Sequence, residues 1–191
     1  DPDQVVVLTE RTESGARSGA SPLNMSDWNA GSPSLTATAG FTNGVGGMVM
    51  RGVDGSAETV SRQWVSSGFF EVLGVPPLVG RLFQPGDDWV EHESVVLTEA
   101  YWRTRFNADP AIIGRDLVLD GESYRVVGVA PAAFRWTENN SIFALIRVRP
   151  SPELRTAYFM RGIGRLAAGA SVDRARAEIT AVAADLARTV P

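Results

Sequence analysis

The most regular pattern of apolar residues lies near the C-terminal end of the chain, where they recur at spacings of three and four. This spacing places them along one side of a helix, with Ser171 as its N-cap and Asp173 in its first turn. The apolar stripe consists of Val172, Ala175, Ile179, Val182, Leu186 and Val190. The pattern therefore predicts a long amphipathic helix that closes the chain.

Three shorter helices are predicted from their capping signals. Ser21 stands directly before a proline, which is typical of a helix start. Ser66 or Ser67 suits the cap of a second helix, whose buried side would be formed by Phe69, Phe70 and Leu73. Gly74 fits the left-handed position that ends this helix, and a nearby proline prevents its continuation. Thr98 suits the N-cap of a helix over residues 99–106.

Short apolar runs between these helices predict the strands. The clearest signal is Asp120-Gly121, because this pair between two apolar runs is typical of a tight β-hairpin. Residues 9–20 are polar and predict a loop. Strands are predicted over residues 5–8, 35–41, 48–51, 59–65, 95–97, 117–119, 124–129 and 157–166. Helices and strands alternate without the long parallel crossovers of a doubly wound sheet, so the predicted fold class is α+β.

The amino-acid composition excludes several classes of function, mainly because two residue types, cysteine and lysine, do not occur. The chain has 191 residues, a net charge of −4 and no cysteine. A mildly acidic chain argues against a nucleic-acid partner, and the lack of cysteine excludes disulfides and cysteine-ligated metals. All 18 basic residues are arginine, so the chain offers neither a Schiff-base lysine nor the lysine of a Walker ATP site. No apolar run is long enough to span a bilayer, and the start at Asp1 suggests an excised or processed piece.

One short motif has the spacing of a dinucleotide-binding loop. Residues 162–167, GIGRLA, match the G-x-G-x-x-A pattern. The predicted helix begins only after Gly169, so no helix N-terminus stands beside the glycines to receive a pyrophosphate. An ordinary connection between strand and helix is the favoured interpretation, and no cofactor is expected.

His92 is the only histidine and stands between Glu91 and Glu93. A general base would need a nucleophile or an orienting carboxylate nearby, and a metal would need more ligands. Asp87 and Asp88 leave a weak, oxygen-rich calcium site open, but a solvated acidic loop is the favoured interpretation. No metal site is therefore predicted.

Arginines are concentrated late in the chain, where five of them accompany the single acid Glu153. They are Arg147, Arg149, Arg155, Arg161 and Arg165. This stretch could bind an anion or a lipid headgroup, although the solvated face of a strand pair and loop is the favoured interpretation. Since no group of residues assembles a catalytic constellation, no catalytic residue is predicted and the chain is not expected to be an enzyme.

A series of segments in one order is similar to a known family. Residues 65–76, VSSGFFEVLGVP, come first and continue through GRLF at 80–83 to Asp87 and Asp88. Further segments are VVLT at 95–98, YWR at 101–103, RF at 105–106, DP at 109–110, IGR at 113–115, LDG at 119–121, residues 124–131, GRL at 164–166 and ARAE at 175–178. Together they resemble the MacB-like periplasmic core domain of bacterial ABC-transporter permeases, in the FtsX-like permease superfamily. Residues 21–28, SPLNMSDW, resemble its subset of duplicated orphan permeases.

The chain also departs from the family pattern. Residues 142–145 lack the usual Trp and Pro, and Ala167-Ala168 replaces a more usual Lys-Pro. Both departures are expected where the chain passes between subdomains. The family closes with another strand and a membrane helix that are not present in this chain.

The resemblance implies a fold of two lobes. A porter-like α/β lobe is expected from residues 1–74 and 142–191, and a smaller, strand-rich lobe, called sabre in the family, from the inserted residues 75–141. The hairpin around Asp120 falls in the expected insertion, and the C-terminal amphipathic helix in the outer lobe.

The resemblance also implies a place and partners. The domain would lie on the periplasmic side of the bacterial inner membrane, between flanking transmembrane helices of the same full-length chain. A second permease subunit or duplicated half and a separate cytoplasmic ATPase would be partners, and a periplasmic adaptor protein is a further option. The domain would then convert helix motion into export or mechanical work by rigid-body displacement. The alternatives are a stand-alone binding module for a lipid, peptide or drug, and a hydrolase or metalloenzyme built around His92.

Overall fold

Segments distant in the sequence combine into two units in the computed structural model of this chain. The structure describes residues 2–11, 15–52, 55–89, 93–137, 139–147 and 152–189. Unit 1 consists of Asp1–Asn43, Glu71–Gly74 and Val148–Pro191, and unit 2 consists of Gly44–Phe70 and Val75–Arg147. Each unit is described below by itself.

Unit 1 contains an antiparallel sheet in the order β1-β12-β4. The strands are β1 (Val5–Leu8), β12 (Met160–Leu166) and β4 (Leu35–Thr42), and β12 is antiparallel to both neighbours. Two glycines of β12 allow β1 to lie close, because a Cβ at Gly162 would stand 2.9 Å from the carbonyl oxygen of Leu8. Residues 162–166 of the GIGRLA motif therefore belong to a strand, and the two glycines serve packing within the sheet.

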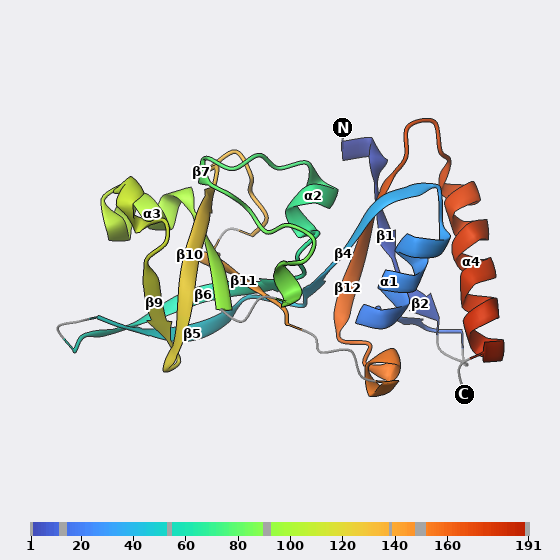
Figure 1. The fold of residues 1–191 in the computed structure, drawn as a ribbon, viewed down its shortest axis with the longest axis horizontal. Helices are drawn as coiled ribbons and strands as arrows, with labels where there is room; N and C mark the ends of the chain where they lie inside the picture. The colour runs from blue at the N-terminus through green and yellow to red at the C-terminus, as the bar shows by residue number, and fades with distance from the viewer. Residues whose placement is uncertain are drawn as a thin grey trace. The chain divides into compact units, whose positions relative to one another are not determined.

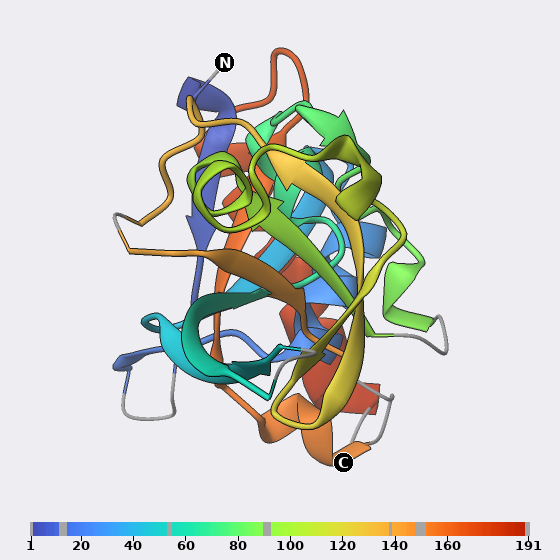
Figure 2. The same cartoon turned by 90° about the vertical axis from the view of Figure 1, so that its left-hand side faces the viewer.

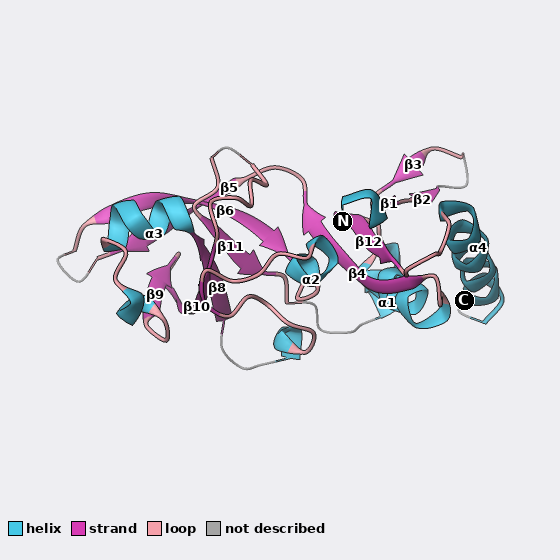
Figure 3. Ribbon diagram, turned by 90° about the horizontal axis from the view of Figure 1, so that it is seen from above, coloured by secondary structure: helices cyan, strands magenta, loops and turns pink. Residues whose placement is uncertain are grey.

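Two helices accompany this sheet. The side chain of Ser21 caps α1 (Pro22–Gly31) by accepting the Asn24 N–H at 3.0 Å. Figure 1 shows α1 beside α4 (Val172–Thr189), and the two helices are in contact at Gly31, where a Cβ would lie 2.5 Å from Cγ2 of Val182. The short elements of this unit, visible in part in Figure 3, are η1 (Pro2–Gln4), β2 (Glu10–Arg11), β3 (Arg17–Ser18) and η4 (Pro152–Thr156).

Unit 2 is built on a closed ring of strands in the order β6-β11-β8-β10-β9-β5. The ring closes because β5 pairs with β9 on one side and with β6 on the other. Figure 2 looks onto this ring, with β10 in yellow and β6 in teal. The strands are β5 (Gly46–Arg51), β6 (Ala57–Val65), β8 (Glu93–Thr98), β9 (Asp116–Leu119), β10 (Glu122–Ala130) and β11 (Ile142–Leu145), and β7 (Val79–Gly80) pairs with β10.

Apolar side chains fill this unit. One cluster joins residues of all the ring strands with Trp102 of α3 (Glu99–Phe106). A second, aromatic cluster is formed by the first residues of α2 (Phe69–Leu73) and the rings that surround them. Its members are Phe69, Phe70, Phe83, Phe134, Trp136 and Phe143. The remaining short helices are η2 (Asp87–Trp89) and η3 (Pro110–Ile112).

The structure differs from the sequence-based expectation at several places. Residues 142–145 form β11, a strand of unit 2 that is buried along its whole length. The predicted strand over residues 157–166 begins only at Met160, and the predicted loop at 9–20 contains β2 and β3. Val190, the last residue of the predicted stripe, lies outside the described residues.

The boundaries of the two units also differ from those of the two expected lobes. Residues 44–70 were expected in the porter-like lobe of residues 1–74 and 142–191, but all of them lie in unit 2 because β5 and β6 pair with β9 and β11. Residues 142–147 join unit 2 for the same reason, because β11 pairs with β6 and β8.

We predict that truncation of Leu119 lowers the stability of unit 2 strongly. Leu119 is 0% exposed in the ring interior, so Leu119→Ala should cost about 2–5 kcal/mol of unfolding free energy. The neighbouring Val118 is 41% exposed, and Val118→Ala should change stability by about 0.5 kcal/mol or less. Urea denaturation of both variants measures the difference, and equal losses would contradict the placement of Leu119 in the interior.

Candidate functional site

A hollow lies within unit 1. It has a volume of about 980 Å³ and is bordered by β1, β2, α1, η4 and α4. Apolar and aromatic residues supply much of its wall, namely Val6, Val7, Leu8, Trp28, Tyr158, Val172, Ile179 and Leu186. Polar residues supply the rest, including Glu10, Arg11, Arg17, Asn24, Arg155 and Arg176. Its volume and mixed lining are typical of a site that receives an apolar body with a polar end.

The apolar stripe of α4 forms one wall of this cavity and is only partly covered. Among the residues of α4 that the structure describes, only Ala175 is buried. Val172 is 48% exposed, and Val7 across the cavity on β1 is 74% exposed. A helix with a strong apolar stripe ordinarily packs that stripe against a partner. This surface is therefore available for a further contact.

The strand β1 forms another wall and has an open edge. Within the described residues it pairs with β12 alone and stands at the end of its sheet. An open edge presents unpaired backbone N–H and C=O groups, to which a polar or extended partner can bind. The cavity thus combines apolar side chains with backbone hydrogen-bonding groups.

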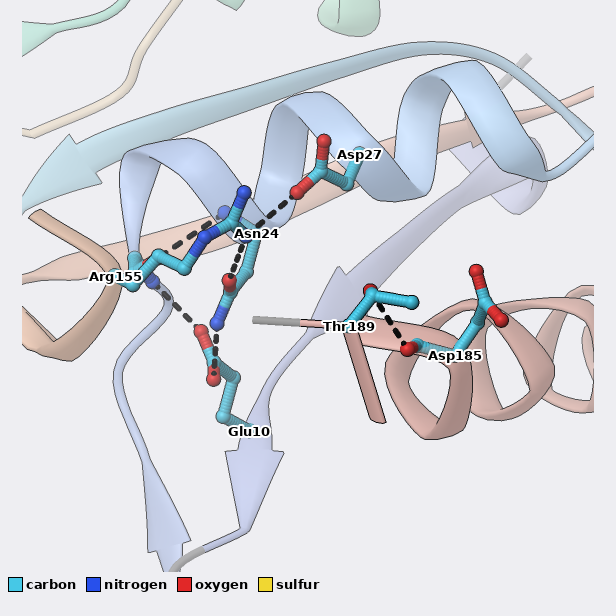
Figure 4. Close-up of polar contacts among 7 residues, drawn as sticks. Glu10, Asn24, Asp27, Arg155, Asp185 and Thr189 are labelled. Carbon is cyan, nitrogen blue, oxygen red and sulfur yellow. Dashed lines mark hydrogen bonds and ion pairs between the residues drawn. The ribbon is translucent and has the colours of Figure 1, made fainter. Parts of the chain in front are cut away.

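A polar network joins the elements at one end of the cavity, as Figure 4 shows. Glu10 accepts the Ser21 N–H and the Asn24 Nδ2–H group, each at 2.8 Å. Arg155 donates to Oδ1 of Asn24 at 3.1 Å and to Oδ2 of Asp27 at 2.7 Å. The network therefore ties β2 and η4 to α1 and fixes that end of the cavity.

Burial governs the charge state of Glu10. Desolvation raises the pKa of its carboxyl above the ordinary value, although the hydrogen bonds from Ser21 and Asn24 act in the opposite direction. The cations around the cavity are only partly neutralised. Arg176 pairs with Asp173 at 2.8 Å, and Arg11 donates to the Gly15 carbonyl at 2.9 Å. Since the lining holds four arginines against Glu10 as its acid, the cavity favours anions.

Glu178 fastens α4 to the rest of unit 1. Its Oε2 accepts hydrogen bonds from Ser32 Oγ and from the Ser34 N–H, both at 2.9 Å, while Oε1 accepts from Arg174 Nε at 3.0 Å. The Ser34 backbone N–H is the main cause that lowers the pKa of Glu178 to about 2. The carboxylate therefore stays charged at every physiological pH.

The acidic segment considered for calcium has its carboxylates engaged within the protein. Asp87 accepts from Arg81 at 2.6 Å and from the Gln84 N–H at 3.0 Å, and Asp88 accepts from the Ser67 hydroxyl. His92 and Glu91 lie outside the described residues. No group of three or more potential metal ligands occurs in the part of the chain that the structure describes.

The late arginines do not act as one group. Arg147 pairs with Glu93 at 2.8 Å in unit 2, whereas Arg155 and Arg165 lie in unit 1. Arg165 donates to the Val72 carbonyl at 2.8 Å. Arg149 lies outside the described residues, and Arg161 is exposed. Only Arg155 of this stretch lines the cavity, which the sequence pattern did not indicate.

Comparison with known proteins identifies the family. The family model described as MacB-like periplasmic core domain matches residues 1–182, so the chain belongs to this family. No match was found among curated proteins. None of the helices among the described residues combines the length and the apolar character needed to span a membrane.

Several solved structures with the same fold are domains of transporters or permeases. The periplasmic region of MacB from Actinobacillus actinomycetemcomitans has a TM-score of 0.67 at 14% identity, over 96% of this chain and 84% of that chain. The extracellular domain of the noncanonic ABC-type transporter YknZ from Gram-positive bacteria has a TM-score of 0.60 at 13% identity, over 95% and 93%. A domain of a Porphyromonas gingivalis protein named as a permease has a TM-score of 0.68 at 15% identity, over 97% and 84%. The predicted family and the mixed helix-and-strand fold class are therefore confirmed.

We predict that the stabilising effect of Glu178 disappears in acid. Its pKa is depressed from 4.5 to about 2 in the folded chain, so its contribution is complete above 4.5 and is lost as the pH falls toward 2. Glu178→Gln should therefore melt below the wild type at pH 7, and the gap should narrow steadily below pH 4.5. Asp173→Asn is the matched control, because Asp173 is 88% exposed and pairs only along its own helix with Arg176. A pH-independent gap for Glu178→Gln would contradict the assigned contacts.

Proposed function

We propose that this chain is the extracytoplasmic domain of an ABC-transporter permease subunit, and that it transmits movement without transforming a molecule. The family membership over residues 1–182 is the observation that carries the proposal. Flanking transmembrane helices of the full-length chain would anchor the domain on the periplasmic side of the bacterial inner membrane. A separate cytoplasmic ATPase would drive those helices, and a second permease subunit or duplicated half would complete the transporter. Export, or mechanical work outside the membrane, would be the result.

The construction of the two units supports a mechanical role. The first strand, β1, and the last helix, α4, both belong to unit 1, so movement of either flanking segment would enter the same unit. Unit 2 has a ring of strands closed by the pairing of β5 with β9 and a filled interior, and such packing resists deformation. A domain that transmits movement by rigid-body displacement must keep its shape while it is displaced. In this proposal unit 1 corresponds to the porter-like lobe and unit 2 to the strand-rich, sabre-like lobe, where an adaptor protein could bind.

The engaged carboxylates and the lining of the cavity, among the described residues, are consistent with this proposal. The described carboxylates of the acidic segment bind to Arg81, Gln84 and Ser67, and the cavity of unit 1 contains no cysteine or histidine. The absence of lysine from the whole chain means that the ATP site of a Walker motif must lie in another chain or segment.

We predict that ATP displaces the domain as a rigid body in the full-length permease with its ATPase. The chain contains no cysteine, so a spin label at Ser123→Cys is unique within it. The distance from this label to one on the other permease subunit should change between nucleotide-free and ATP-bound states, as measured by pulsed electron paramagnetic resonance. Labels at Ser123 and Thr59, both exposed in unit 2, should keep a constant separation. Identical inter-subunit distances in every nucleotide state would rule the proposal out.

The cavity of unit 1 favours a second candidate function, a binding module for an amphipathic anion, which has an apolar chain and an acidic end. Its apolar wall would bury an acyl chain, and the arginines would face the acidic end. This candidate differs from the first because it requires a ligand and no movement of the membrane helices.

The binding-module candidate predicts that laurate protects the domain against heat. At about 100 times its dissociation constant, a ligand that binds only the folded state stabilises it by about 2.7 kcal/mol. Ile179→Asp places a charge in the cavity wall and should abolish the shift in melting temperature. Ala181→Asp, on an exposed position of the same helix, should leave it unchanged. No shift for the wild type, or equal shifts for both variants, would eliminate this candidate.

A further inference from the structure

The attachment of α4 to unit 1 combines partial apolar packing with polar contacts. The helix runs over Val172–Thr189, yet Ala175 is its one buried residue among those that the structure describes. Val182 contacts α1 at Gly31, but Ile179 and Leu186 face the cavity. Apolar packing is ordinarily the main force that holds an amphipathic helix in place. Ile179, Val182 and Leu186 are half-buried, so polar contacts add to a partial apolar packing.

Glu178 links α4 to residues far away in the sequence through polar contacts. Its Oε2 accepts from Ser32 Oγ and from the Ser34 N–H, which are 146 and 144 residues away. Both serines are almost wholly buried, at 1% and 2% exposure. Removal of the carboxylate would leave these buried donors without their acceptor, which costs more than the loss of an exposed hydrogen bond. Arg174 binds the other oxygen and keeps the carboxylate oriented.

Ser32 and Ser34 lie on the segment that leads from α1 into β4. The two serines form the connection between α1 and β4, and Ser34 stands directly before Leu35, the first residue of β4. β4 ends at Thr42, and the chain enters unit 2 at Gly44. The contact therefore links the last helix of the domain to the strand that continues into unit 2.

We propose that Glu178 is the positioning residue through which movement of α4 reaches β4 and, along the chain, unit 2. This inference rests on the proposed function, because it assigns the route of a displacement that enters through the C-terminal helix. With Glu178 bound to Ser32 and Ser34, α4 and β4 move together. Without it, α4 follows the membrane segment while β4 stays behind.

The test uses the full-length permease with its ATPase in a lipid bilayer. Glu178→Gln keeps the size of the side chain and removes its charge, whereas Asp173→Asn makes the same change at an exposed position of the same helix. One label pair, Ala181→Cys with Thr36→Cys, reports the distance between α4 and β4, and both positions are exposed. The label at Ser123 reports the ATP-driven displacement of unit 2.

We expect Glu178→Gln to separate ATP hydrolysis from displacement. The amide of the variant can still accept a hydrogen bond but carries no charge, so the contact to Ser32 and Ser34 is weaker. The ratio of attached to detached helix should fall by about tenfold, and the distance distribution between α4 and β4 should broaden. The displacement at Ser123 should shrink severalfold while ATP hydrolysis continues. Asp173→Asn should match the wild type in all three measurements. A residue that served stability alone would lower the folded fraction without changing the displacement per ATP hydrolysed in the molecules that remain folded.

The outcomes separate this inference from the proposed function. Displacement of the wild type together with full displacement of Glu178→Gln would overturn the role of Glu178 and leave the transmission proposal standing. No displacement of the wild type would overturn both. Should Glu178→Gln fail to fold, Ser32→Ala removes one donor and leaves the carboxylate bound to Ser34, and it should lose a smaller part of the displacement. Full displacement of Ser32→Ala with an unchanged distance distribution would likewise overturn the inference.

Discussion

The pairing of β12 with β1 and β4 is the interaction on which unit 1 depends. β12 lies more than 150 residues after β1 in the sequence and pairs with it directly. On its other side β12 pairs with β4, so it joins the two strands into one sheet. Close approach on the β1 side requires Gly162, because any side chain there would collide with the Leu8 carbonyl group. Without this arrangement the cavity would lose a wall, and α4 would have no sheet to pack beside. The same glycines that resemble a nucleotide-binding motif are thus explained by strand packing.

The two units differ in how the edge strands of their sheets are paired. In unit 2 the ring of strands closes on itself, so its apolar residues are enclosed and its backbone groups are paired around the ring. In unit 1 the sheet stays open at β1, and α4 leaves part of its apolar stripe uncovered. Enclosed surface stabilises a unit, whereas uncovered apolar surface next to an open edge is where binding can occur. This contrast is why unit 1 contains the candidate site.

Local signals in the sequence predicted most elements of the fold and little of the candidate site. The caps at Ser21 and Thr98 and the turn at Asp120 depend on neighbouring residues only, and the structure has helices and a hairpin at those positions. β11 was not predicted, because four apolar residues buried on both faces have neither the period of a helix nor that of a half-buried strand. The cavity depends on how much of α4 the rest of the unit covers, which periodicity does not reveal. Glu178 has Arg174 one turn earlier, so its sequence context indicates a surface ion pair, and its buried partners are far away in the chain.

The closure of the ring in unit 2 has one narrow point. β5 and β9 are joined at two residue pairs, Met50 with Leu119 and Arg51 with Val118, whereas β5 and β6 are joined at six. This seam has the fewest residue pairs of any junction in the ring, so thermal fluctuations should part the ring there before it parts elsewhere. The opened form would be a sheet with two free edges and exposed methionines, which is prone to join with another copy of itself. Long-term solubility of the domain would then depend on this seam more than on the total stability of the fold.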